Sequence, residues 1–198
     1  MARRRADRTW YLAVVGLVLL VLVIGLMATR PQGSPLGWLA RATALLGYLF
    51  IFLGIVSSAY MRQVYRILGR PFIGVHHILS VSGLVLVTLH PLAVALDSMS
   101  LRVFLPKFDS WLVFLQLGGR PAWYLLVVAA LTALLRKTIG KNWLVIHFLN
   151  YVAFWLATVH AVMIGTDFGT GFVRGGAVAL ALVVVFISIQ KRLKKRGR

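Results

Sequence analysis

The chain contains no cysteine and no glutamate, and only 4 of its 198 residues are acidic. Without cysteine it cannot form a disulfide, an iron–sulfur cluster, a thiolate haem ligand or a covalent CxxCH haem attachment. Charged residues of both signs make up only 13% of the chain, whereas 60% of it is hydrophobic. This composition lies far outside the range of soluble domains and indicates an all-α integral membrane protein.

The few charges are almost all positive, with 22 Lys and Arg residues and a formal net charge of +18. A charge of this size can indicate a nucleic-acid-binding protein. Here, however, the basic residues flank apolar runs, as the positive-inside rule expects of membrane proteins. We therefore predict a lipid bilayer, and no nucleic acid, as the partner of these cations.

The apolar runs predict a bundle of six transmembrane helices within a single domain, residues 1–198. The predicted spans cover roughly residues 10–27, 36 or 42 to 61, 75–96, 121–135, 143–164 and 177–189. The segments 62–71 and 136–142 are predicted to be basic loops, and 166–176 a glycine-rich loop. Residues 97–120 mix apolar and polar side chains too evenly to span, so we expect an interfacial segment between the third and fourth helices.

The basic residues also predict the orientation of the chain. Six spans place both termini and the loops at 62–70 and 136–141 on one side, and that side carries most of the 22 Lys and Arg residues. Both termini should therefore face the cytoplasm. The expected location is the plasma or inner membrane, crossed several times.

Five histidines stand out in this apolar background. His76, His77 and His90 lie in the third predicted helix, and His147 and His160 lie in the fifth. An ionisable side chain within a membrane helix is expensive to bury and marks a functional site by default. Both helices run in the same direction, so His76 and His147 should lie near the inner side, with His90 and His160 roughly 20 Å away near the outer side.

Each level can supply two axial imidazoles to one haem iron. We therefore predict two haem b groups, held by His76 with His147 and by His90 with His160; a single haem is the alternative. His76 and His90 are separated by nearly four full helical turns, so they share one face of the helix. His147 and His160 are one residue closer in sequence, and an ideal helix would place them on different faces. Helix tilt, local unwinding or ring rotamers must absorb that difference. His77 points about 100° away from His76, so both cannot serve one iron. His77 lies 13 residues before His90, which mirrors the spacing in the fifth helix, but we prefer His76 as the inner ligand.

Haem propionates need cations or hydrogen-bond donors. The candidates at the inner level are Arg62, Arg66, Arg70, Arg136 and Lys141, with His77 as a further contact, and those at the outer level are Arg41 and Arg120. Arg41 is the preferred one because it is predicted to lie within a helix end. The simpler alternative is that each of these residues is an ordinary interfacial anchor.

The segment HHILSVSGLVLVTLHPL and the histidine spacing resemble the ferric reductase-like transmembrane domain superfamily, the cytochrome b core of ferric reductases and NADPH oxidases. The resemblance covers roughly residues 36–190. In that family the third and fifth helices each carry two haem-ligating histidines. The resemblance assigns this role to His76, His90, His147 and His160.

Within this superfamily the chain is similar to MsrQ-type haem-binding membrane subunits of bacterial methionine sulfoxide reductase systems. The shared features are the small size, the Arg-Ala-Thr-Ala-Leu stretch at 41–45, and the segments GRPAWYLL and GKNWLVIHFLNYV. MsrQ-type chains can lack the innermost histidine of the third helix. This chain keeps His76, which favours a di-haem core.

The resemblance implies an oxidoreductase-type electron-transfer subunit that needs a partner, because no soluble flavin or NADPH domain is expected within residues 1–198. A cytosolic flavoprotein reductase or membrane quinol would donate electrons, making flavin or quinone a further cofactor. A protein or small molecule outside the cytoplasm would accept them. No catalytic residue is predicted. The alternatives are a self-contained outer-surface reductase of ferric chelates or oxygen, and a non-redox membrane transporter or scaffold.

Overall fold

The computed structural model describes residues 8, 10–29, 33–69 and 71–196, and it is all-helical over these residues. Five helical segments are long and apolar enough to cross a membrane, which agrees with a multi-pass membrane protein. They are α1 (Trp10–Ala28), α2 (Pro35–Ala59), α4 (Phe72–Asp97), the run formed by α7 (Arg136–Ile139), η2 (Gly140–Asn142), α8 (Trp143–His147) and α9 (Leu149–Ile164), and α10 (Gly171–Arg196).

The fourth predicted span forms a shorter helix than a full membrane crossing requires. Helix α6 (Gly119–Leu134) has 16 residues. At 1.5 Å per residue it is about 24 Å long, against about 30 Å for the hydrocarbon core of a bilayer. By length alone the structure therefore supports five spans.

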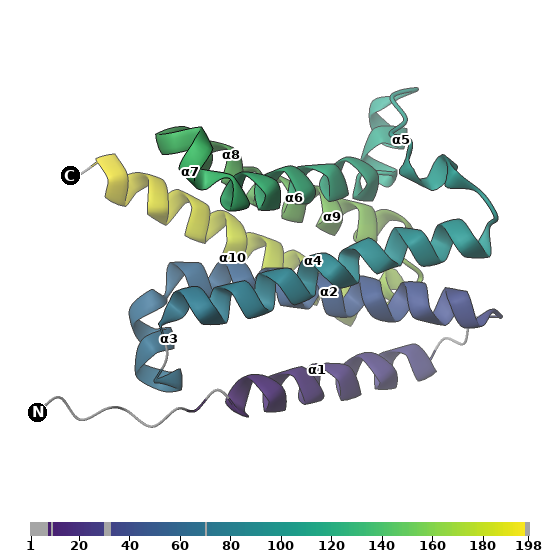
Figure 1. Ribbon diagram of the computed structural model, residues 1–198. Coiled ribbons are helices and arrows are strands. Elements are labelled where there is room, and N and C mark those ends of the chain that lie inside the picture. Colours follow the sequence, from purple (N-terminus) through teal and green to yellow (C-terminus); the bar gives the residue numbers. More distant parts are fainter. Residues whose placement is uncertain (1–7, 9, 30–32, 70, 197–198) are drawn as a thin grey trace, which may run out of the picture.

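The long helices lie side by side, and their ends gather at the two ends of the bundle (Figure 1). The start of α1 and the end of α10 lie at one end, with α3 (Met61–Leu68) and α7. The opposite end carries η1 (Leu101–Phe104), α5 (Trp111–Gln116) and η3 (Thr166–Gly169). We call the first the α3 end and the second the α5 end.

Two of the predicted basic loops are helical instead. Most of the segment predicted as the 62–71 loop forms α3, because Val64 and Leu68 recur at helical spacing and pack against Val75 and Leu79. Gly69 ends α3 in the left-handed conformation, at φ 72°. Likewise the predicted turn at 136–142 forms α7 and η2. The prediction of loops at 62–71 and 136–142 was wrong because it relied on the many charged residues there and overlooked that such segments can form short helices.

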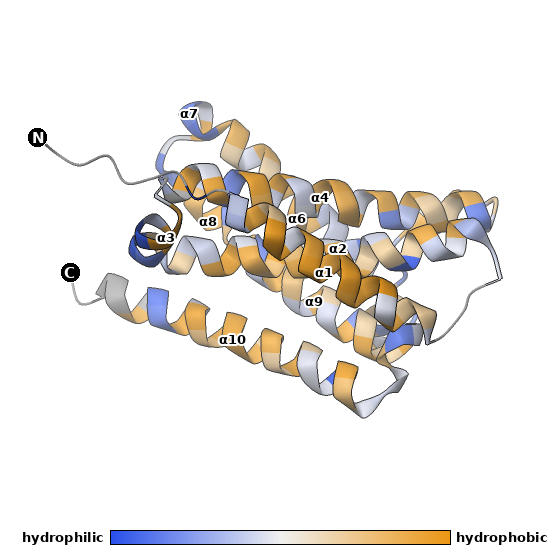
Figure 2. Cartoon of the chain, turned by 90° about the horizontal axis from the view of Figure 1, so that it is seen from below, coloured by the Kyte–Doolittle hydropathy of each residue, from blue (hydrophilic) through white to orange (hydrophobic). Residues whose placement is uncertain are grey.

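The connection at 97–120 contains only short helices, as the prediction of a non-spanning segment expects. Ser100 caps η1 by accepting from the backbone N–H of Arg102, and Ser110 caps α5 by accepting from that of Val113. Several large apolar side chains here are exposed, with Met99 at 89% and Trp111 at 74%. Figure 2 shows similar apolar colouring along the outer faces of α1 and α10. Such faces suit contact with lipid.

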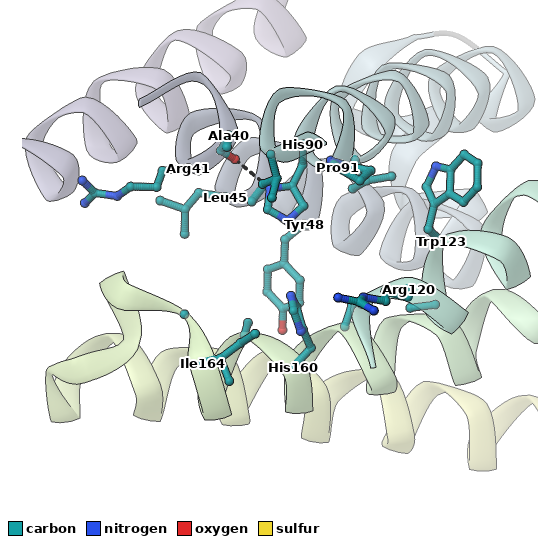
Figure 3. Close-up of a pocket in the computed structure, with 18 of the residues that line it drawn as sticks. Ala40, Arg41, Leu45, Tyr48, His90, Pro91, Arg120, Trp123, His160 and Ile164 are labelled. Atoms are coloured by element: carbon teal, nitrogen blue, oxygen red, sulfur yellow. Dashed lines mark hydrogen bonds between the residues drawn. The ribbon is translucent and has the colours of Figure 1, made fainter. Parts of the chain in front are cut away.

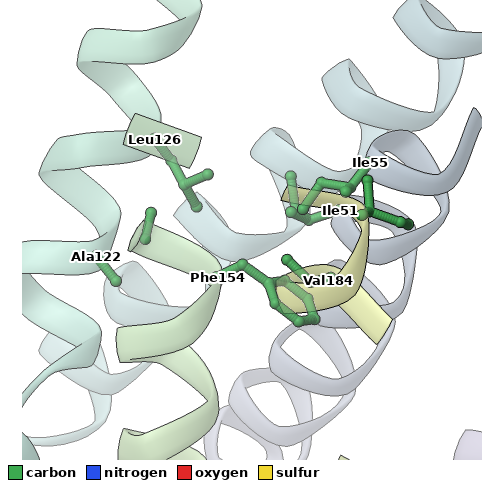
Figure 4. Packing of buried hydrophobic residues seen from close by; sticks show 8 residues of the cluster. Ile51, Ile55, Ala122, Leu126, Phe154 and Val184 are labelled. Atoms are coloured by element: carbon green, nitrogen blue, oxygen red, sulfur yellow. The ribbon is translucent and has the colours of Figure 1, made fainter. Parts of the chain in front are cut away.

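The interior of the bundle is a cluster of apolar side chains contributed by α2, α6, α9 and α10 (Figure 4). Phe154 of α9 is only 1% exposed, and it lies against Ile51 of α2 and Val184 of α10. Phe154 also stacks on Tyr48, with ring centres 4.6 Å apart. This cluster holds the α2–α4 layer against the α6–α9 layer.

Glycines bring α2 and α4 unusually close together, and these two helices make the most extensive contact in the fold. A Cβ atom added at Gly47 would lie 2.9 Å from the backbone nitrogen of Val87, and one at Gly54 would lie 2.6 Å from the Ser80 hydroxyl. A Cβ at Gly83 of α4 would in turn lie 3.0 Å from the backbone nitrogen of Ile51. Small residues at these positions let the two backbones approach, as in other membrane helix pairs.

The replacement Gly47→Ala should force α2 and α4 apart, because the backbone of Val87 cannot turn aside as a side chain can. We expect it to destabilise the fold by about 1–3 kcal/mol. The matched control is Gly25→Ala in α1, where an added Cβ would meet nothing within 4 Å. Thermal unfolding of the two detergent-solubilised variants checks this. Equal midpoints for both would contradict the close-packing account.

Candidate functional site

Four of the five histidines share one hydrogen-bonding arrangement. The Nδ1 atom of each lies close to a backbone carbonyl oxygen of another helical segment. The pairs are His76 with Gly54 at 2.9 Å, His90 with Ala40 at 3.0 Å, His147 with Ala129 at 2.9 Å and His160 with Gln116 at 2.6 Å. A carbonyl oxygen can only accept, so each Nδ1 carries the ring proton and donates it. Each Nε2 is then the lone-pair nitrogen, which is the form that binds metals.

The carbonyl acceptors repeat the spacing of the histidines. Ala40 and Gly54 lie on α2 with the same separation in sequence as His90 and His76 on α4. The acceptors of the second pair, Ala129 on α6 and Gln116 on α5, likewise have the same separation as His147 and His160. Each histidine-bearing segment therefore lies antiparallel to a neighbour that presents one carbonyl at each level.

The awkward spacing between His147 and His160 is accommodated partly by an interruption next to His147. Helix α8 ends at His147 and α9 begins at Leu149. In the first turn of α9, the Tyr151 backbone N–H bonds to the Phe148 carbonyl, three residues earlier, at 3.1 Å. A bond over three residues tightens the turn and advances the helical phase. This local change in helix geometry helps to turn His147 and His160 toward the same side despite their spacing.

His76 and His147, the pair predicted for the inner level, lie next to each other at the α3 end. Their ring centres lie 6.4 Å apart with an angle of 75° between the ring planes. A metal ion between two imidazoles lies about 2 Å from each nitrogen, which places the ring centres about 6 Å apart. The separation in the structure therefore matches two imidazoles that share one metal ion.

His90 and His160 line a cavity of about 470 Å³ at the α5 end. They enter it from opposite sides, with Tyr48 and Arg120 beside them (Figure 3). A Cβ atom at Gly119 would lie 2.8–2.9 Å from the His160 ring, so a glycine is needed for the ring to lie there. The volume falls within the roughly 300–1,000 Å³ of ligand and cofactor sites.

His77 belongs to neither pair. Its side chain is exposed, and its ring centre lies 6.2 Å from that of His76. The structure thus places His76, and not His77, opposite His147. The role of His76 as the inner ligand stays a prediction.

The basic residues predicted to contact haem propionates differ in burial and in their partners. Arg41 is 8% exposed and forms a two-point ion pair with Asp167, in which its Nε donates to Oδ2 at 3.0 Å. Arg120 lines the outer cavity and donates from Nη1 to the Leu105 carbonyl at 2.6 Å. Arg62 is exposed on α3. Arg66, Arg136 and Lys141 are exposed as well, and Arg70 lies outside the described residues.

Two functional candidates were missed by the sequence reasoning. Asp167 was assigned to a glycine-rich loop, yet it is 5% exposed and lines the outer cavity. Lys191 was assigned to the C-terminal tail, yet it lies within α10 and contacts α2 and α9. The only signal for Asp167 was its rarity, as one of 4 acidic residues facing 22 basic ones.

A metal ion bound by protein side chains alone has no site in the described part of the chain. No three His, Asp or Glu side chains gather there in a suitable cluster. Each histidine pair supplies two ligands at most.

One family model matches the chain over residues 36–167, described as "Domain of unknown function (DUF8596)". The chain belongs to this family. No curated protein and no solved structure matches it. The DUF8596 region contains all four paired histidines and their carbonyl acceptors, together with both partners of the Arg41–Asp167 ion pair.

The ion pair between Arg41 and Asp167 should stabilise the α5 end of the bundle, because it joins α2 to η3 across a buried space. Arg41→Met or Asp167→Asn alone leaves one charge buried without its partner, and each should cost about 3–5 kcal/mol. The double variant Arg41→Met/Asp167→Leu should recover part of that loss. Thermal unfolding in detergent measures all three.

The matched control is Arg174→Met, which removes an exposed cation at the same end and should change stability little. Single variants of Arg41 and Asp167 as stable as this control would show that the pair does not hold η3 in place.

Proposed function

We propose that this DUF8596 chain is a b-type haem transmembrane electron-transfer protein of the ferric reductase-like superfamily. The observation that carries the proposal is the shared arrangement of His76, His90, His147 and His160. Each imidazole is fixed by an Nδ1–H bond to a backbone carbonyl. His76 lies next to His147, and His90 and His160 line one cavity. Carbonyl-bonded imidazoles of this kind are typical of metal-ligating histidines.

A purely structural role would use one of the two ring nitrogens of each of these histidines. A helix–helix hydrogen bond accounts for Nδ1 but leaves each Nε2 as an acceptor. In the inner pair the rings of His76 and His147 are neighbours, and two Nε2 acceptors cannot bond to one another. An iron ion between the two rings would bond to both nitrogens at once.

In this proposal His76 and His147 hold the inner haem iron, and His90 and His160 hold the outer one. Haem iron with two imidazole ligands supplies one-electron redox chemistry. Leu126 and Phe154, which line the outer cavity, would supply apolar walls against the outer haem. Arg120 is the outer cation best placed for a propionate, since it lines the cavity and Arg41 is engaged by Asp167.

We further propose six spans, with α6 as the additional one. Helix α6 supplies the carbonyl of Ala129 at the level of His147, and the preceding α5 supplies that of Gln116 at the level of His160. This segment therefore covers the same depth as the part of α8 and α9 between the two histidines. The basic residues of the α3 end favour the cytoplasmic side for that end and for both termini, in a plasma or inner membrane.

The direction of transfer follows from this orientation and from the family resemblance. Electrons would enter at the α3 end from a cytosolic flavoprotein reductase or from membrane quinol. They would leave at the α5 end to an extracytoplasmic protein or small acceptor. The chain acts in this proposal as the subunit that carries electrons across the bilayer.

The haem content of the purified protein tests the proposal. We expect about two haems per wild-type chain, with b-type bands in reduced-minus-oxidised spectra. His76→Ala and His90→Ala should each lower the content to about one, because each removes a ligand from a different site. His77→Ala is the matched control and should keep both. A wild-type chain that binds no haem, even when haem is supplied during expression, would refute the proposal.

The topology can be tested with single cysteines, because the natural chain has none. Lys107 precedes α6 and Lys137 follows it, and both are exposed. With six spans, a membrane-impermeant maleimide should label Lys107→Cys in intact cells and Lys137→Cys only after lysis. If α6 does not cross the membrane, the two positions lie on the same side and will be labelled together.

A further inference from the structure

A lysine lies beside the inner histidine pair. Lys191 of α10 is partly buried, and its Nζ donates to the hydroxyl of Ser58 on α2 at 3.0 Å and to that of Tyr151 on α9 at 3.1 Å. It also lies within electrostatic range of His76. A lysine directed into a membrane bundle carries a large desolvation penalty and marks a functional position by default.

The two partners of Lys191 place it at the depth of the inner pair. Ser58 lies four residues after Gly54, whose carbonyl binds His76, and Tyr151 lies four residues after His147. Residues four apart in a helix share a face and lie within about 6 Å of each other along it. Lys191 therefore joins α2, which presents the Gly54 carbonyl to His76, to α9, which follows His147 in the chain.

The charge of Lys191 has no compensating carboxylate among the described residues near it. The acidic residues that the structure describes are Asp97, Asp109 and Asp167, and all three belong to the α5 end of the bundle. Ser58 and Tyr151 are neutral, and they occupy two of the three ammonium protons. Tyr151 accepts from Lys191, which leaves its own hydroxyl proton available for donation.

We propose that Lys191 and Tyr151 form an anion site that binds one carboxylate of the haem held by His76 and His147. The inference rests on the proposed function and assigns the inner propionate contact to α10. Three of the arginines predicted to contact the inner propionate, Arg62, Arg66 and Arg136, are exposed, whereas Lys191 is partly buried. In a low-dielectric site, a cation, an O–H donor and a carboxylate compensate one another.

The test is a redox titration of the purified haem protein in neutral phosphatidylcholine vesicles. A cation near a haem favours the reduced state, because reduction removes one positive charge from the iron. Lys191→Met should therefore shift one of the two midpoints downward, by about tenfold in the reduction equilibrium or about 59 mV for one electron. The other midpoint should stay unchanged. Tyr151→Phe should shift the same midpoint downward by less. Lys191→Arg keeps the positive charge and should leave that midpoint at its wild-type value.

The matched control is Lys137→Met, which removes an exposed lysine of α7 at the same end of the bundle and should move neither midpoint. Lower thermal stability without a midpoint shift in Lys191→Met would overturn the inference, because Lys191 would then only join α10 to α2 and α9. A shift that appears only in vesicles of anionic lipid would also overturn it, in favour of a lipid phosphate as the anion.

The inference and the proposed function can fail separately. A wild-type protein without haem refutes both. A protein with a single haem that is insensitive to His76→Ala overturns the Lys191 site but leaves an electron-transfer role at the outer level. A di-haem protein whose midpoints ignore Lys191→Met overturns the Lys191 site alone.

Discussion

The hydrogen bond from an imidazole Nδ1–H to the backbone carbonyl of a neighbouring segment is the interaction on which the arrangement of the helices depends. An imidazole in a bilayer needs a partner for its N–H, and a helix carbonyl can accept a second bond while it stays in its own helix. Four such bonds fix the register of α4 against α2 and that of α8 and α9 against α6 and α5. Sliding either pair by one residue would break two of them.

The close contact of α2 and α4 is a condition for these bonds. Gly54 both supplies the carbonyl for His76 and, lacking a side chain, lets Ser80 approach. Gly119 has a similar role at the outer level, where a Cβ would overlap the His160 ring. Glycine is unfavourable in a helix interior, because it adds backbone entropy to the unfolded state. At these positions its small size allows the packing that the histidines need.

The sequence predicts the helices, the two levels and the pairing of the histidines because these depend on local patterns and chain direction. Apolar runs set the spans, and two helices that run in the same direction place His76 level with His147. Residues whose environment depends on distant contacts were not predictable. Asp167 is buried only because η3 folds back onto α2, 126 residues away from its partner Arg41. Lys191 was misplaced because α10 continues beyond its apolar stretch.

The proposed haem binding would be linked energetically to folding through the two helical layers. Within the histidine network, His76 and His90 are fixed to α2, whereas His147 and His160 are fixed to α6 and α5, so none of the four bonds joins one layer to the other. The apolar cluster around Phe154 and Ile51 carries that contact in the centre of the bundle. A metal shared by His76 and His147, or by His90 and His160, would bridge the layers at its two ends. Because the unfolded chain cannot form such a bridge, cofactor binding would add its own free energy to the stability of the bundle.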